Sequence, residues 1–113
     1  MHEMSIAMNI VEICEDEVKK AGGKAVNRIE LEIGTLSGVI PDALEFAMQE
    51  AVKETVLQQA GRKIHMKQAK ARCQECDHTF DIDDFVAVCN SCGSFKTEVI
   101  QGKEMKIKSL VVS

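Results

Sequence analysis

The sequence predicts an α+β fold, in which two helices cover a three-stranded sheet and a small cysteine-rich module is inserted between the last two strands. Apolar residues recur at helical spacing near the start of the chain, and the next segment alternates between apolar and charged residues. Two Cys-x-x-Cys pairs, twelve residues apart, follow further along. The length of 113 residues, 45% of them hydrophobic, suits one modest globular unit plus such a module.

The first two elements are a helix over about 5–21 and a strand over 28–33. Apolar residues recur every three or four positions in the helix, which places them on one face toward a core. Those residues are Ile6, Ala7, Ile10, Val11, Ile13, Cys14 and Val18. Cys14 belongs to this face, so we expect a small buried hydrophobe there rather than a metal ligand. In the strand, strict alternation predicts one buried and one solvated face.

A second helix and two further strands complete the predicted sheet. Pro41 suits the first turn of a helix, which is expected to run to about Val56. Its predicted buried residues are Leu44, Ala47, Met48 and Ala51. A strand over about 63–71 leads into the cysteine module, and a strand over about 104–112 leaves it. Because an insertion needs its two ends close together, these two flanking strands are predicted to pair with each other.

The two Cys-x-x-Cys pairs, Cys73/Cys76 and Cys89/Cys92, predict a structural zinc site. Each pair offers two thiolates about one turn apart, and four thiolates match the tetrahedral geometry of structural zinc. A module this small rarely folds without such a cross-link. Its three aromatic residues, Phe80, Phe85 and Phe95, are expected to form its core. We therefore predict a zinc-binding module over 72–99 and a discontinuous α+β domain over 1–71 plus 100–113.

Competing interpretations of the four cysteines are two disulfides, a redox Cys-x-x-Cys and iron in a rubredoxin-like site. Disulfides are the weakest of these, because five cysteines leave one unpaired and the first residues lack a basic signal-peptide region. No apolar run reaches membrane-spanning length either. The expectation is a cytoplasmic chain with no membrane association.

The charge of the module argues against nucleic-acid binding. Between residues 72 and 99 two basic residues stand against six acidic ones, a net charge of −4, and the whole chain is also at −4. Phosphate binding depends on clustered Lys and Arg, which displace counterions. We expect no nucleic-acid partner.

The chain begins Met1-His2-Glu3, which can chelate a second metal ion. The amine of Met1, the amide nitrogen of His2 and its imidazole Nδ1 can form fused chelate rings with three nitrogens in one plane. A carboxylate oxygen of Glu3 or a further amide nitrogen can add a fourth ligand. Tetragonal nitrogen-rich geometry favours Ni²⁺ or Cu²⁺ over zinc. The alternative is a solvated His2, since short motifs of this kind also occur by chance.

Several motifs in order resemble the HypA family of nickel metallochaperones for hydrogenase maturation. They are Met1-His2-Glu3 directly before a helix, Glu32-Ile33-Gly34, Pro41-Asp42-Ala43-Leu44-Glu45-Phe46-Ala47, the two Cys-x-x-Cys pairs and Gly102-Lys103-Glu104-Met105. The resemblance spans essentially the whole chain. It implies that His2 is the essential nickel ligand, with the Met1 amine and Glu3 nearby, and that the four module cysteines hold zinc.

The resemblance also implies transport of Ni(II) as cargo rather than catalysis. The expected partners are the nickel-handling GTPase HypB and the hydrogenase large-subunit precursor, with urease maturation as a possible second destination. The chain is expected to act as a monomer or a homodimer. Two other classes remain as alternatives: a zinc-ribbon adaptor for a protein or nucleic-acid partner, in which His2 has no role, and a Cys-x-x-Cys oxidoreductase, which Cys₄ ligation precludes.

Overall fold

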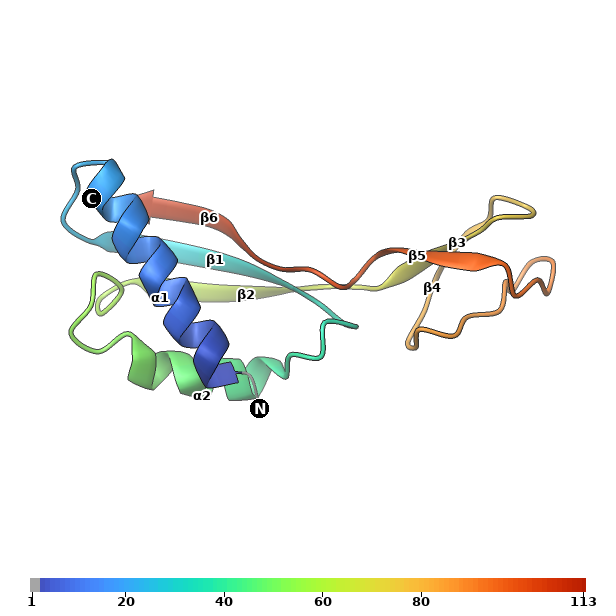
Figure 1. Ribbon diagram of the computed structural model, residues 1–113, viewed down its shortest axis with the longest axis horizontal. Coiled ribbons are helices and arrows are strands. Elements are labelled where there is room, and N and C mark those ends of the chain that lie inside the picture. Colours follow the sequence, from blue (N-terminus) through green and yellow to red (C-terminus); the bar gives the residue numbers. More distant parts are fainter. Residues whose placement is uncertain (1–2) are drawn as a thin grey trace.

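Two three-stranded sheets lie one after the other along the longest axis of the molecule (Figure 1). The computed structural model describes residues 3–113 and measures 54 × 27 × 17 Å along its principal axes. The elements in chain order are α1 (Glu3–Lys20), β1 (Val26–Gly34), α2 (Pro41–Ala51), β2 (Gly61–Lys67), β3 (Lys70–Cys73), β4 (Thr79–Asp81), β5 (Thr97–Gln101) and β6 (Met105–Val112). This is the α+β class that the sequence predicts, with the four cysteines in the second sheet and its loops.

The first sheet has the strand order β2-β1-β6, with both helices on one face (Figure 1). Strand β1 runs parallel to β2 and antiparallel to β6, and Leu31 lies opposite Ile64 on one side and Ile107 on the other. The prediction that the two flanking strands pair with each other is therefore wrong, because β1 lies between them. The apolar side chains of β1 are at most 1% exposed. They are buried because β1 is the central strand, with a neighbouring strand on each side.

The ends of the module are brought together by its own strands instead. The second sheet has the order β4-β3-β5, in which Ala71 lies opposite Phe80 in β4 and Val99 in β5. This sheet begins at Lys70 and ends at Gln101, so it extends slightly beyond the predicted module of 72–99. The division into a module and a discontinuous domain stays a prediction.

Helix α1 buries a narrower face than its sequence pattern predicts. Its buried residues are Ala7, Ile10, Cys14 and Val18, at spacings of three and four, whereas Ile13 is 42% exposed. Cys14 has no exposed surface, as predicted. Burial, with a smaller effect of the neighbouring acidic residues Glu15 and Glu17, raises the pKa of its thiol to about 11. Cys14 is thus a packing residue that stays protonated at neutral pH.

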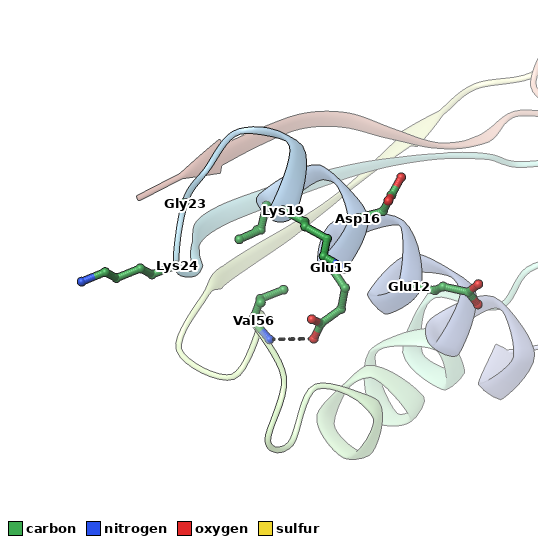
Figure 2. Close-up of a pocket in the computed structure, with 8 residues that line it drawn as sticks. Glu12, Glu15, Asp16, Lys19, Gly23, Lys24 and Val56 are labelled. Atoms are coloured by element: carbon green, nitrogen blue, oxygen red, sulfur yellow. Dashed lines mark hydrogen bonds between the residues drawn. The ribbon is translucent and has the colours of Figure 1, made fainter.

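Helix α2 ends at Ala51 rather than near Val56. The backbone of Val56 makes hydrogen bonds elsewhere: its N–H donates to Glu15 Oε2 at 3.2 Å (Figure 2), and its carbonyl accepts from Val26 N at 2.9 Å. Glu54 has a φ of +60°, which no helical residue adopts. These contacts tie the segment after α2 to α1 and β1, so a longer helix would lose them.

The two sheets meet at a tightly packed waist, where the predicted strand over 63–71 breaks into β2 and β3. The end of β1 enters this waist, and Thr35 Oγ1 accepts a hydrogen bond from Ala69 N at 2.9 Å. A Cβ on Gly34 would lie 2.0 Å from the Gly102 carbonyl oxygen. A Cβ on Gly102, whose φ is +110°, would lie 2.3 Å from Ala69 Cα. Glycine at 34 and 102 therefore allows three chain segments to cross.

No helix within residues 3–113 is long and apolar enough to cross a membrane.

Candidate metal centre

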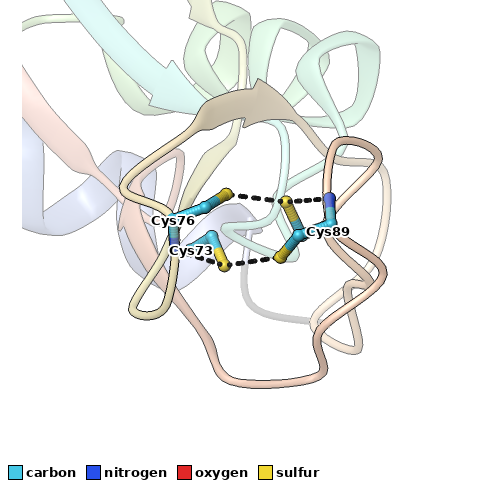
Figure 3. Close-up of side chains that lie close together, drawn as sticks. Cys73, Cys76 and Cys89 are labelled. Carbon is cyan, nitrogen blue, oxygen red and sulfur yellow. Dashed lines mark hydrogen bonds between the residues drawn. The ribbon is translucent and has the colours of Figure 1, made fainter.

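The second sheet and its loops bring the four predicted cysteines into one cluster. Their sulfur atoms all lie within 4.8 Å of one another, and the Cys73–Cys92 and Cys76–Cys89 sulfur pairs are each 3.6 Å apart. Figure 3 shows the Cys73, Cys76 and Cys89 side chains converging from two turns. A disulfide requires sulfurs about 2.05 Å apart, and all four thiols are free. Four sulfurs about 2.3 Å from a tetrahedral zinc ion lie about 3.8 Å apart, so the cluster fits one such ion.

The two Cys-x-x-Cys turns have the same local structure. In the first turn, the N–H groups of Glu75 and Cys76 donate to Cys73 Sγ at 3.4 and 3.5 Å. In the second turn, two N–H groups donate to the first cysteine sulfur at 3.4 Å each, from Ser91 and Cys92 to Cys89. Each turn therefore directs two backbone dipoles at one sulfur, which stabilises a thiolate there.

A left-handed residue completes each turn. Asp77 has a φ of +68° and Gly93 a φ of +77°, and each directly follows the second cysteine of its pair. Their N–H groups return to the carbonyls of Cys73 and Cys89, both at 2.9 Å. Glycine and aspartate tolerate this conformation better than most residues. The local sequence thus supports the turn that each metal-binding pair needs.

The pKa values of the clustered cysteines shift in opposite directions. The N–H of Cys76 is the main cause of a lowered pKa at Cys73. Burial raises the pKa of Cys89, but the N–H groups of Cys92 and Ser91 outweigh it and lower that pKa to about 6. The N–H of Ser94 lowers the pKa of Cys92, but the neighbouring cysteines and burial raise it to about 12. The neighbouring cysteines thus oppose ionisation of Cys92, and a divalent ion bound among the four sulfurs would offset this effect.

The histidines stay outside this cluster. His78, which follows the first pair closely, stacks on Phe80 with ring centroids 5.8 Å apart. His65 lies in β2, and its Nε2 lies 2.5 Å from Glu30 Oε1 on the neighbouring strand. Within residues 3–113, the four cysteines are the one group of potential ligands that is close enough to share an ion.

The predicted nickel ligands Met1 and His2 lie outside the described residues, so the structure does not test them. Glu3 begins α1, and its Oε2 accepts a hydrogen bond from Ile40 N at 3.4 Å. Ile40 directly precedes α2, so the Glu3 carboxylate lies near the N-terminal ends of both helices. The start of α1 lies beside α2, whereas the cysteine turns lie beyond the waist at the far end of the molecule (Figure 1).

The prediction for the aromatic residues of the module is correct only for Phe80. Phe80 is 8% exposed, but Phe85 and Phe95 are 57% and 76% exposed. The small core of the module consists of Ala69, Ala71, Cys73, Phe80, Ile82 and Cys89, with Leu36, Ala87 and Val99 packed against it. Phe80 lies in β4, where Thr79-Phe80-Asp81-Ile82-Asp83 alternates between polar and apolar residues, whereas Phe85 and Phe95 lie in the irregular connection to β5. This alternation is the sequence signal that separates the buried Phe from the exposed ones.

Comparison with known proteins gives consistent results over the full chain. The family described as HypA, hydrogenase/urease nickel incorporation, metallochaperone, matches residues 1–112. The Hydrogenase maturation factor HypA of Geotalea uraniireducens is 42% identical over 112 residues, which is 99% of each chain. That of Geobacter metallireducens is 40% identical, again over 99% of each chain.

Solved structures agree with the fold. The solution structure of the Ni metallochaperone HypA from Helicobacter pylori superposes with a TM-score of 0.71 at 27% identity, covering 99% of this chain and 97% of that one. A second solution structure of a HypA protein gives a TM-score of 0.75 at 27% identity, with coverage of 100% and 97%. These matches and the four-cysteine centre lead to one conclusion: the chain belongs to the HypA family of nickel-incorporation metallochaperones for hydrogenase maturation, which are maturation factors rather than enzymes.

Proposed function

We propose that this chain binds Ni(II) through its first three residues and delivers it to the hydrogenase large-subunit precursor, while a structural Zn(II) holds the cysteine module. The observation that carries the proposal is the family match, which begins at residue 1 and so includes the Met1-His2-Glu3 motif. The four cysteines form a closed ligand set for one ion. A closed set suits a permanent structural ion, so the cargo ion needs another group of donors.

The donor atoms at the N-terminus suit an ion that must be released. The Met1 amine, the His2 amide nitrogen and the His2 imidazole supply nitrogen ligands, and Glu3 adds a carboxylate. Nickel accepts this tetragonal set, whereas zinc prefers four-coordinate tetrahedral sites. Glu3 begins α1 and also accepts from Ile40 N, so its carboxylate is held at the start of the two packed helices.

The family role supports particular partners. We propose that the GTPase HypB assists nickel loading, that the chain works in the cytoplasm as a monomer or homodimer, and that urease maturation is a second destination. The family description, which names nickel incorporation into hydrogenase and urease, supports the two destinations.

Calorimetric titration of nickel into zinc-loaded protein without a tag tests the nickel site. We expect His2→Ala to abolish tight nickel binding while the zinc content stays at one ion per chain, because the four module cysteines form a complete zinc ligand set without His2. His65→Ala is the matched control and should bind nickel as the wild type does. Wild-type nickel affinity in His2→Ala would contradict the proposal and favour a zinc-ribbon adaptor.

Two further measurements examine the donor atoms. An N-terminal extension removes the free amine and should block nickel loading. Acidification from about pH 7.5 to about pH 5.5 should release nickel, because protonation of the His2 imidazole removes a donor. Normal loading of the extended chain would exclude a role for the amine.

A further inference from the structure

Four large apolar side chains lie exposed in the connection between β4 and β5. They are Phe85, Val86, Val88 and Phe95, with exposed fractions of 57%, 80%, 44% and 76%. We call them the apolar tip. Scattered single apolar residues on a surface are ordinary, but four in one connection of a small module indicate an interaction site. The metal centre does not use these side chains, since its sulfurs come from the neighbouring turns.

The connection that carries the tip is held firmly on the module, so its exposure is a property of the fold. Ile82 is buried, its N–H donates to Ala69 O at 3.0 Å, and its carbonyl accepts from Gln68 Nε2 at 3.0 Å. Ala87 packs on the module core, and its carbonyl accepts from Thr97 Oγ1 at 2.9 Å. The side chains between and beside these anchors are thereby turned outward.

Hydrogen bonds also bring the segment that carries Val88 beside the segment that carries Phe95. The contact between Ala87 and Thr97, with a second one from Cys89 N to Ser94 O at 2.9 Å, places segment 87–89 beside segment 94–97. Val88 and Phe95 therefore belong to adjoining stretches of chain. Phe95 also lines an open hollow whose other walls include Cys76, Cys92 and Glu75.

Acidic residues border the tip. Asp83 and Asp84 precede Phe85 directly, and Glu75 is held beside Phe95 because its Oε1 accepts from Ser94 Oγ at 3.2 Å. Lys96 is the one basic residue between positions 82 and 96. Four thiolates on a divalent ion add a formal charge of −2 next to this surface. The tip is thus an apolar patch within a negative field.

We propose that the apolar tip is a docking surface for a partner protein whose own apolar patch is bordered by Lys or Arg. The negative border repels nucleic acid and anionic lipid surfaces. It also opposes contact between the tips of two copies of this chain, because like charges would meet. Lys or Arg side chains on the partner would pair with the acidic residues at the border, while the Phe side chains would be buried in the interface. The inference does not depend on the nickel ligands, none of which lies on the tip.

Fluorescence anisotropy with two synthetic amphipathic helices tests the proposal on the zinc-loaded full-length chain. Both helices carry the same leucine face, bordered by Lys in one and by Glu in the other. The Lys-bordered helix should bind at least about tenfold more tightly, and Phe85→Ser with Phe95→Ser should weaken it at least about tenfold. Phe85→Leu with Phe95→Leu should retain binding. Asp83→Asn with Asp84→Asn should weaken the Lys-bordered helix and reduce its salt dependence.

Phe46→Ser is the matched control, because Phe46 is 70% exposed on α2 in the other part of the molecule. It should leave binding unchanged. Zinc content and the amide spectrum of the second sheet verify that each variant is folded. Equal affinity for both helices, unchanged binding after loss of both Phe rings, or an equal loss in Phe46→Ser would overturn the proposal. So would a dimer seen by sedimentation that the double Phe→Ser variant dissolves, since a second copy would then occupy the tip.

Discussion

The two sheets of this protein differ in what holds them together. The first sheet and its helices bury thirteen residues of the described chain in one apolar core, whereas the second sheet buries six, two of which are cysteines. A segment of about 30 residues exposes too much surface to fold on burial alone. One chain thus combines a part stabilised by the hydrophobic effect with a module that we expect to depend on a metal ion.

The largest expected effect follows from removing the metal ion. A chelator, or Cys76→Ser, should unfold the second sheet while β1 and both helices stay folded. Binding of structural zinc contributes about 10–16 kcal/mol at neutral pH in small zinc domains. Amide hydrogen exchange, measured residue by residue, should show loss of protection in β3–β5 and retention in β1. Loss of protection in both sheets together would show that they form one cooperative unit.

A substitution in the apolar core should destabilise the first sheet and leave the metal centre of the second sheet intact. Leu31→Ala in β1 removes a side chain that is 1% exposed and should cost about 3 kcal/mol of unfolding free energy. Its zinc content should stay at one ion per chain. Ile100→Ala is the matched control in β5, where the side chain is 47% exposed, and should cost about 0.5 kcal/mol or less. Chemical denaturation followed by circular dichroism measures both, and similar costs would refute the contrast.

The waist links the two sheets. Gly102→Ala tests how tightly the chain segments pack there. Gly102 and Gly38 both have a positive φ, +110° and +82°, but only Gly102 lies against a neighbouring backbone. We expect Gly38→Ala to cost about 1 kcal/mol for its conformation alone. Gly102→Ala should cost roughly 2 kcal/mol, because Ala69 must also move. Thermal unfolding of the two variants measures the difference in their stability. Equal costs would mean that the backbone at the waist can move apart to accept a Cβ at position 102.

The smallest effect concerns the ion pair between α2 and β2. Arg62 Nε donates to Glu45 Oε1 at 3.2 Å, and this pairing lowers the pKa of Glu45 although burial opposes the shift. A carboxyl group with a lowered folded pKa stabilises the fold above its unfolded pKa, and the stabilisation is lost as pH falls through the folded value. Because Glu45 is 39% exposed, Glu45→Gln should cost at most about 1 kcal/mol at pH 7 and less at about pH 3.

Denaturation of Glu45→Gln at both pH values measures this effect. Glu50→Gln, which removes the more exposed pair with Lys53, is the control and should change stability by less than about 0.5 kcal/mol. A Glu45→Gln cost that persists at acidic pH would assign the effect to packing rather than to charge.

Local patterns account for the predictions that the structure confirms. The helical period from Ala7 to Val18 and the alternation in β1 depend only on neighbouring residues, and both elements form close to the expected positions. Each Cys-x-x-Cys pair likewise forms its own local turn, and the predicted convergence of the four cysteines is confirmed. Sequence comparison adds the family, and the structure leaves the N-terminal nickel ligands untested.

The wrong predictions all concern contacts between distant segments. Helix α2 stops at Ala51 because the backbone of Val56 is bonded to Glu15 and Val26. The strands beside the module do not pair, because β1 needs a neighbour on each side. Phe85 and Phe95 are exposed, because the small module core is already filled by Phe80, Ile82 and Ala87.

Local patterns in the sequence predict the class of fold, the first helix, the strand that follows it and the set of four sulfurs. These depend on periodicity and spacing, which short stretches of chain encode. The order of the strands, the crossing of the chain at Gly34 and Gly102, and the exposure of particular apolar side chains emerge from the folded structure. Those outcomes result from competition among distant segments for a limited interior, and no local pattern records that competition.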